Sequence, residues 1–256
     1  MSIRLSDRMM AIVRMVSSGQ CAIKDKNRIV ADIGCDHGFV SIYMVQNGLA
    51  DKMIAMDVAE GPLSTAKANV LEAGVSEKIE LRLSNGFDAI CRGETNTAII
   101  AGMGGQLILS IVESGLDKLD DGYELVMSPQ SDIRLFRESL RKDGILIIDE
   151  DMIYEDGKFY NIIKAVVNKK TPLKQSGKEA EKDGDDITAL YDTYGEYLIK
   201  KKSPVLIEYI EKEIEKKQGI YCRLSKKDTE NTVNRLFEID SELKKLSKVR
   251  GMLGLY

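Results

Sequence analysis

Two aspartates and two glycines lie close together in the stretch VADIGCDHGFV, residues 30–40. Asp32, Gly34 and Gly38 have the spacing D-x-G-x-x-x-G, at the point where a β-branched apolar segment gives way to a helical pattern. Glycines allow a ligand to approach the backbone closely, and the first turn of the following helix offers free N–H groups. The spacing therefore predicts a ligand-binding turn between a strand and a helix.

The charge of this turn favours a cationic ligand over a dinucleotide. A dinucleotide site has the spacing G-x-G-x-x-G, and Asp36 occupies the place of its middle glycine. A carboxylate there would repel a pyrophosphate. S-adenosylmethionine carries a sulfonium and an ammonium group and no phosphate, so Asp32 and Asp36 fit this cofactor better than NAD.

Further polar residues and glycines follow the next predicted strands. Asp57 closes the second strand, where an acid can accept hydrogen bonds from both ribose hydroxyls. Asn85 and Gly86 follow the third strand, and the Asn85 amide is suited to read the adenine edge. The fourth strand ends in AGMGG, residues 101–105, which leaves an open floor beside the cofactor methyl group, with Met103 as its large side chain. Three unrelated turns are the alternative interpretation, because Asn, Asp and Gly are common turn residues.

The elements that must position these residues alternate between strand and helix. Strands are predicted at residues 28–34, 52–57, 78–83, 97–101 and 123–127, and a final, antiparallel pair at 144–149 and 159–167. Helices are predicted at residues 4–17, 38–47, 61–73, from 106 onward and at 132–141. This alternation indicates βαβ units, and so the fold class is α/β with a mostly parallel, seven-stranded sheet.

The pattern changes after residue 168. Residues 169–187 are charged and nearly without apolar residues, which predicts a loop or linker between a domain of residues 1–168 and a helical domain of residues 188–256. Ser203-Pro204 is typical of a helix start. Two stripes with spacings of three and four then predict an antiparallel helical hairpin, close to a short coiled coil. Their members are Leu206, Ile210, Ile214, Lys217, Tyr221 and Leu224, followed by Val233, Leu236, Ile239, Leu243 and Leu246.

Composition limits the class of protein. The chain has 256 residues, of which 43% are hydrophobic, as in an ordinary packed core. It has no run of about 18 apolar residues that would predict a membrane span, and residues 1–8 lack the apolar core of a signal peptide. These features favour a cytoplasmic protein. Four scattered cysteines without a CxxC pair, beside a single histidine, give little support to a zinc site, so no metal is expected.

The net charge of −4 is unevenly distributed along the chain. Residues 1–30 contain six basic and two acidic residues, and residues 196–256 contain 14 basic and ten acidic ones. Each end therefore carries +4, and the middle carries −12. A polyanionic partner would therefore bind the basic residues at the two ends of the chain. Chance variation on solvated helix faces explains the same counts.

These motifs together resemble the TrmK family of tRNA (adenine-N1)-methyltransferases, which modify adenine 22 in the D-loop of tRNA. The resemblance is carried by ADIGCDHGFV at 31–40, EGP at 60–62 and IAGMGG at 100–105, and it continues through the helix at 131–142 and Tyr194-Gly195. It implies a Rossmann-like class I methyltransferase domain and a C-terminal coiled-coil region. It also implies S-adenosyl-L-methionine as cofactor and tRNA as partner.

We assign candidate roles to the residues on this basis. The cofactor-binding candidates are Asp32, Gly34, Cys35, Gly38, Asp57, Val58, Asn85, Gly86, Gly102, Met103 and Gly104. The substrate-binding candidates are Arg8, Met103, Ser128, Pro129 and Gln130. The catalytic candidates are Asp36 and His37.

The chemistry at adenine N1 sets what these residues must do. N1 of neutral adenine has a free lone pair, so alignment with the methyl group matters more than a strong base. A carboxylate such as Asp36 would favour the positive charge that develops on the base, and His37 would orient the base or hydrogen-bond the turn. N1 lies on the Watson–Crick edge, so the target must be splayed out of its loop.

Three other functions compete with this hypothesis. A small-molecule methyltransferase would share the cofactor turn. A non-enzymatic RNA-binding or partner-binding protein would use the helical tail as its functional part. An NAD dehydrogenase is disfavoured by Asp36. The tail can pair internally or with a second chain, and a monomer is favoured.

Overall fold

The computed structural model describes residues 3–18, 28–169, 182–226 and 230–255. The chain divides into two compact units, Met1–Lys178 and Glu179–Tyr256, called the N-terminal and C-terminal units below. No helix in the described ranges is long and apolar enough to cross a membrane.

The N-terminal unit is built on one seven-stranded sheet with the order β3-β2-β1-β4-β5-β7-β6. The first five strands are parallel, and β7 runs antiparallel to both β5 and β6. The mostly parallel sheet and its antiparallel final pair are therefore confirmed. The strands are β1 Ile29–Ile33, β2 Lys52–Asp57, β3 Ile79–Leu83, β4 Thr97–Ala101, β5 Glu124–Ser128, β6 Ile145–Glu155 and β7 Lys158–Val167.

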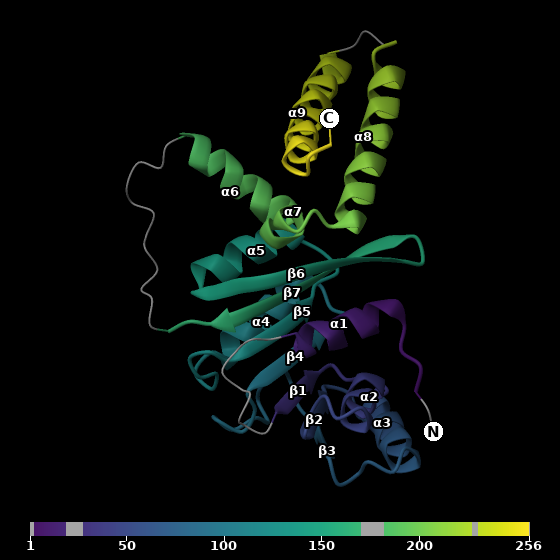
Figure 1. Cartoon of the computed structure of the whole chain (residues 1–256), viewed down its shortest axis with the longest axis vertical. Coiled ribbons are helices and arrows are strands. Elements are labelled where there is room, and N and C mark those ends of the chain that lie inside the picture. Colours follow the sequence, from purple (N-terminus) through teal and green to yellow (C-terminus); the bar gives the residue numbers. More distant parts are fainter. Residues whose placement is uncertain (1–2, 19–27, 170–181, 227–229, 256) are drawn as a thin grey trace. The chain divides into compact units, whose positions relative to one another are not determined.

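Helices cover both faces of this sheet (Figure 1). One apolar cluster joins the sheet to α1 Asp7–Ser17, α2 Phe39–Gln46 and α3 Glu60–Glu72. The other joins it to α4 Gly105–Gly115 and α5 Ile133–Lys142. Successive residues of one strand alternate between the clusters, as Ile99 and Ile100 do in β4, because side chains in a strand point to opposite faces. Both faces are buried, and this explains the continuous apolar strands.

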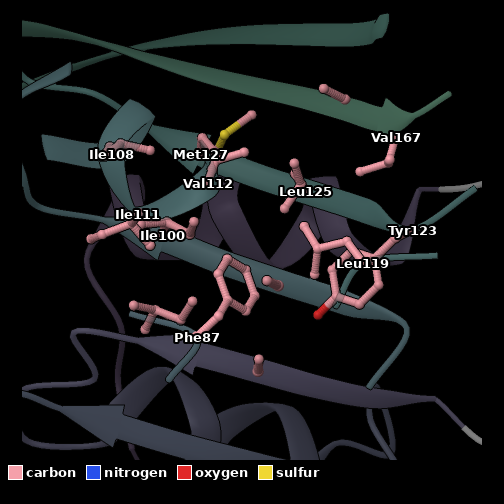
Figure 2. Packing of buried hydrophobic residues seen from close by; sticks show 14 of the residues in the cluster. Phe87, Ile100, Ile108, Ile111, Val112, Leu119, Tyr123, Leu125, Met127 and Val167 are labelled. Carbon is pink, nitrogen blue, oxygen red and sulfur yellow. The ribbon is translucent and has the colours of Figure 1, made fainter. Parts of the chain in front are cut away.

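The loop after β3 is anchored in the core by Phe87. Figure 2 shows Phe87 pointing into the cluster close to Leu119 and Tyr123, and the Phe87 and Tyr123 rings meet edge to face at 6.4 Å. A Cβ atom at Gly115 of α4 would lie 2.4 Å from the Phe87 ring, so the close contact requires glycine there. This packing fixes the segment that carries Asn85 and Gly86.

The C-terminal unit contains the predicted helical hairpin. Its helices are α6 Lys182–Tyr194, α7 Glu196–Lys200, α8 Pro204–Leu224 and α9 Glu230–Met252. Lys217 pairs with Glu242 at 2.6 Å and Glu211 with Arg250 at 2.9 Å, so α8 and α9 run antiparallel. The Ser203 hydroxyl accepts a hydrogen bond from the Leu206 backbone N–H at 3.4 Å, and Pro204 opens the helix as predicted.

Two predictions for this unit are wrong in part. The loop predicted at 169–187 extends too far, because α6 begins at Lys182; residues 170–181 lie outside the described residues. Charge indicates exposure to solvent but does not prevent a helix, and α6 buries Leu190. In the predicted stripes, Tyr221 and Val233 are exposed, at 38% and 57%, whereas Val249, outside the stripes, is buried.

Candidate active site

A cavity of about 400 Å³ lies at the carboxyl ends of β1, β2 and β4 in the N-terminal unit. This is the edge at which ligands bind in open α/β sheets, and the volume suits a small molecule. Of the residues predicted for the site, the cavity lining includes Arg8, Asp32, Gly34, Cys35, Asp36, Asp57, Gly102, Met103 and Gln130. The remaining lining residues were not predicted: Met9, Ile12, Val40, Ile99 and Ala101.

Asp32 is the most deeply placed acid of the site. It lies near the end of β1 with 5% of its surface exposed, and its Oδ2 accepts a hydrogen bond from the Ser41 hydroxyl of α2 at 2.6 Å. Burial raises the pKa of Asp32 to about 6, although the Ser41 hydrogen bond acts in the opposite direction. The carboxylate is thus costly to ionise and favours a cationic ligand beside it.

Asp57 joins the turns that follow β1 and β2. Its Oδ2 accepts a hydrogen bond from the Asp36 backbone N–H at 3.3 Å, and its Oδ1 accepts one from the Ala59 N–H at 3.0 Å. The backbone N–H groups of Gly34 and Cys35 both donate to the Met56 carbonyl, at 2.8 and 2.9 Å. These bonds hold the Asp57 carboxylate at the cavity.

The loop after β4 packs directly on the turn after β1. Gly34 has a φ of +74°, and a Cβ atom there would lie 2.3 Å from the Met103 methyl group. The Gln130 backbone N–H donates to the Met103 carbonyl at 2.9 Å, which ties in the loop after β5. The predicted residues of three separate loops therefore meet around Met103.

Arg8 reaches the cavity from α1. Its backbone N–H donates to the Glu155 carboxylate of β6 at 3.1 Å, and its guanidinium lies 4.8 Å from the centre of the Tyr160 ring of β7. The Nε atom of this half-buried side chain is inaccessible to solvent and has no hydrogen-bond partner among the described residues. The strand pair β6–β7 thus fixes the position of Arg8.

Cys35 lines the cavity as a neutral thiol. It is 8% exposed, and burial, followed by the charges of Asp32, Asp57 and Asp36, raises the pKa of its thiol far above the ordinary range. A thiol that is not ionised is a poor nucleophile. Cys35 therefore contributes shape to the cavity, and covalent catalysis is not expected from it.

His37 lies outside the cavity lining. Its Nε2 is 3.6 Å from the Asp36 carboxylate, its ring packs at 5.8 Å from the Phe39 ring, and its carbonyl accepts a hydrogen bond from the Asn69 amide. The side chain is 48% exposed. A role for His37 in orienting the base stays a prediction.

Several other predicted residues also lie outside the lining. They are Gly38, Val58, Asn85, Gly86, Gly104, Ser128 and Pro129. Val58 is 71% exposed in the turn after Asp57, whereas the Ser128 hydroxyl is buried without a hydrogen-bond partner in the described part of the chain. Their roles stay predictions.

The unpredicted lining residues come mainly from the apolar face of α1 and from β4. Met9 and Ile12 belong to the amphipathic pattern from which a helix was predicted at 4–17. An apolar stripe shows that a helix packs on something, but it does not identify the surface that it covers. Arg8 had been assigned to the site from this helix, but the pattern did not show that Met9 and Ile12 also line the cavity.

The fold and the cavity define an S-adenosylmethionine-dependent methyltransferase of the Rossmann-like class. The chain belongs to the tRNA (adenine(22)-N(1))-methyltransferase family, TrmK, whose family model matches residues 30–248. The resemblance seen in the sequence motifs is thus confirmed.

Individual relatives agree with this assignment. The chain is 32% identical to the tRNA (adenine(22)-N(1))-methyltransferase of Bacillus subtilis over 96% of this chain and 97% of that protein. The crystal structure of B. subtilis TrmK superposes with a TM-score of 0.74 at 29% identity, covering 97% and 99% of the two chains. Streptococcus pneumoniae Sp1610, solved in complex with S-adenosyl-L-methionine, superposes with a TM-score of 0.73 at 27% identity, covering 96% and 99%.

Replacing Asp57 with alanine is expected to weaken cofactor binding roughly 10- to 100-fold, because a charge-assisted hydrogen-bond acceptor is lost and two turns are released. Calorimetric titration with S-adenosylhomocysteine measures the effect. Glu72→Ala, an exposed carboxylate on α3, is the matched control and should bind like the unmodified protein. Equal affinities for all three proteins would contradict the role of Asp57.

Proposed function

We propose that this chain transfers the methyl group of S-adenosyl-L-methionine to N1 of adenine 22 in tRNA. Family membership supports the reaction, and the observation that carries it to this chain is the acidic cavity at the carboxyl ends of β1, β2 and β4. Its lining has three carboxylates, Asp32, Asp36 and Asp57, which suit a sulfonium and an ammonium group and would repel a pyrophosphate.

When bound, S-adenosyl-L-methionine supplies an electrophilic methyl group. Asp32 provides negative charge at the buried end of the cavity, and Asp57 provides two oxygens suited to ribose hydroxyls. Gly102 has open space around it and leaves the floor beside Met103 clear for an incoming base. The residues of the cavity thus hold and orient the reactants.

Asp36 is our candidate for stabilising the charge that develops on the base. It lines the cavity, and it has the left-handed φ of +50° that few residues other than glycine adopt. Its backbone N–H donates to Asp57 at 3.3 Å, which holds this residue at the cavity, and its side chain is 68% exposed there. Because N1 carries no proton to remove, a fixed negative charge suffices and no strong base is required.

The proposal extends to the setting in which the enzyme works. A tRNA substrate is consistent with an enzyme that works in the cytoplasm. The helices α8 and α9 pack against each other within one chain, and Ile210, Ile239 and Leu246 of their stripes are buried, which favours a monomer.

Methyl transfer from labelled S-adenosylmethionine to unmodified tRNA tests the function. We expect incorporation into the natural sequence and none into a tRNA with adenine 22 replaced. Incorporation into both tRNAs would support a tRNA methyltransferase but would contradict adenine 22 as the modified position. Cofactor binding without any incorporation would favour the small-molecule methyltransferase or the non-enzymatic protein.

A further inference from the structure

Two leucines, called the leucine rim below, are exposed in the first turns of α4 and α5. Leu107 and Leu135 are each 53% exposed, although both helices bury their inner faces in the core. A single exposed leucine needs no explanation on a protein surface. These two, however, lie four residues after Met103 and five residues after Gln130, which both line the cavity. Apolar side chains beside a site, instead of scattered, indicate an interaction surface.

The two first turns are joined to each other and to the cavity. The Gly105 backbone N–H donates to the Ser131 hydroxyl at 3.4 Å, and a Cβ atom at Gly105 would lie 2.5 Å from the Ser131 carbonyl oxygen. The loops before the two helices are joined as well, because the Gln130 N–H donates to the Met103 carbonyl at 2.9 Å. The leucine rim is therefore held beside the cavity by one packed pair of turns.

Helix α5 presents a basic face in addition to Leu135. Arg134 and Arg141 are exposed and lie seven residues apart, which places them on one face of the helix. Glu138 is the one acidic residue of α5, and it pairs with Lys142 at 2.8 Å. Positive charge therefore remains on this helix, in the part of the chain whose net charge is otherwise strongly negative. Such a face suits a polyanion.

The buried side of α5 fixes this face in place. Arg137 and Glu150 of β6 are 2% and 1% exposed, and their charged atoms lie 2.7 Å apart. Arg137 also donates to the Asn161 side chain of β7 at 3.0 Å. The helix is thus fastened to the outer strand pair, and its exposed residues are presented on a rigid element. A surface ordered in advance loses less conformational entropy when a partner binds.

We propose that the leucine rim, together with Arg134 and Arg141, binds the tRNA nucleotides that flank the target adenine. The inference rests on the proposed function for the identity of the partner. When a base is splayed out, the faces of its neighbours in the stack are uncovered, and apolar side chains that cover them offset part of this cost. The arginines bind the phosphates of the same nucleotides. Apolar contacts to bases combined with positive charge along the backbone are typical of single-stranded nucleic-acid binding.

Binding of the full chain to tRNA with 2-aminopurine in place of adenine 22 tests the leucine rim without turnover. The fluorescence of 2-aminopurine rises when the base leaves its stack. The double variant Leu107→Ser with Leu135→Ser should reduce this rise by roughly half and weaken tRNA binding about 5- to 30-fold, because two apolar contacts are lost. Leu71→Ser, which replaces a leucine that is 73% exposed on α3, is the matched control and should behave like the unmodified protein.

The salt dependence of tRNA binding tests the arginines. Arg134→Gln and Arg141→Gln should each reduce the slope of log affinity against log salt concentration by about 0.7 to 1, the effect of one lost phosphate contact. Arg92→Gln is the matched control, because Arg92 is exposed and pairs with Asp120 in the segments that precede β4 and β5, at the opposite edge of the sheet. Its slope should equal that of the unmodified protein.

Calorimetry with S-adenosylhomocysteine separates the outcomes. All variants should bind it as the unmodified protein does, and a parallel loss in the leucine variant would show a disturbed cavity and overturn the proposal. Unchanged tRNA affinity, salt slope and fluorescence in the variants would overturn it too. If the unmodified protein bound tRNA without any rise in fluorescence, adenine 22 would not be the splayed base and the proposed function would fail. The affinities of the variants would still decide whether this surface binds RNA.

Discussion

Replacing Asp32 with asparagine is expected to weaken cofactor binding at least tenfold and, at the same time, to stabilise the folded protein above pH 6. The carboxylate is 5% exposed, and its burial raises its pKa from 3.8 to about 6. Asparagine has nearly the same shape, and its oxygen can still accept the hydrogen bond from Ser41. The variant thus keeps the packing and removes a buried charge, and the stability gain is at most about 3 kcal/mol.

The pH dependence gives this prediction a definite sign. Because the pKa of Asp32 is higher in the folded state than in the unfolded state, the folded protein holds an extra proton between about pH 4 and pH 6. The contribution of Asp32 to the free energy of unfolding therefore falls as the pH rises through this range and is constant above it. The pKa of Glu94 is lowered to about 2 by Arg82. Its contribution to the free energy of unfolding therefore rises with pH, and it does so at lower pH than the change at Asp32. The difference between unmodified protein and Asp32→Asn isolates the Asp32 contribution.

Urea denaturation at several pH values measures this difference, and calorimetry with S-adenosylmethionine measures the binding loss.

A cationic ligand beside Asp32 favours its ionised form, so binding to the unmodified protein should release protons below about pH 6. Ser41→Ala is the matched control: it removes a hydrogen bond that lowers the pKa of Asp32, and should move the release to higher pH. A variant Asp32→Asn that binds the cofactor normally would contradict the role of this carboxylate.

The sequence patterns predict the parallel strands well, because most of these strands are buried on both faces. The strand predicted at 144–149 was too short, since β6 continues to Glu155 and is only partly buried. The segment at residues 97–101 is apolar after Thr97 and matches β4 at both ends. The carboxyl ends of parallel strands meet at one edge, so Asp32 and Asp57 could be placed together before their contacts were known. The candidate cofactor turn was predictable for this physical reason.

Other features depend on contacts that no local pattern specifies. The position of Arg8 at the cavity depends on Tyr160, more than 150 positions away in the chain. The start of α6 at Lys182 lies in a charged segment where composition favours a loop. The buried charge at Lys164 interrupts an apolar run, and its partner lies in another strand. In each case the deciding energy is tertiary.

Lys164→Met is expected to lower the free energy of unfolding by about 3–5 kcal/mol, as for a broken buried ion pair. Lys164 of β7 and Glu124 of β5 are 1% and 2% exposed, and their charged atoms lie 3.1 Å apart. The Lys164 ammonium also donates to the Met15 carbonyl of α1 at 3.2 Å. The methionine variant would leave the Glu124 carboxylate buried without its cation, and this uncompensated charge is the main cost.

Removing both charges separates that cost from the loss of packing. The double variant Lys164→Met with Glu124→Leu should recover most of the stability, because well-packed apolar residues can replace a buried ion pair. Recovery will be incomplete, since the Met15 carbonyl still loses its donor and α1 is held less firmly on the sheet. Lys142→Met, which breaks an exposed pair with Glu138, is the control and should leave urea denaturation unchanged.

If the double variant were no more stable than Lys164→Met, the uncompensated charge would not be the cause. The lost anchor of α1 would then dominate, and because α1 lines the cavity, cofactor binding should weaken in both variants.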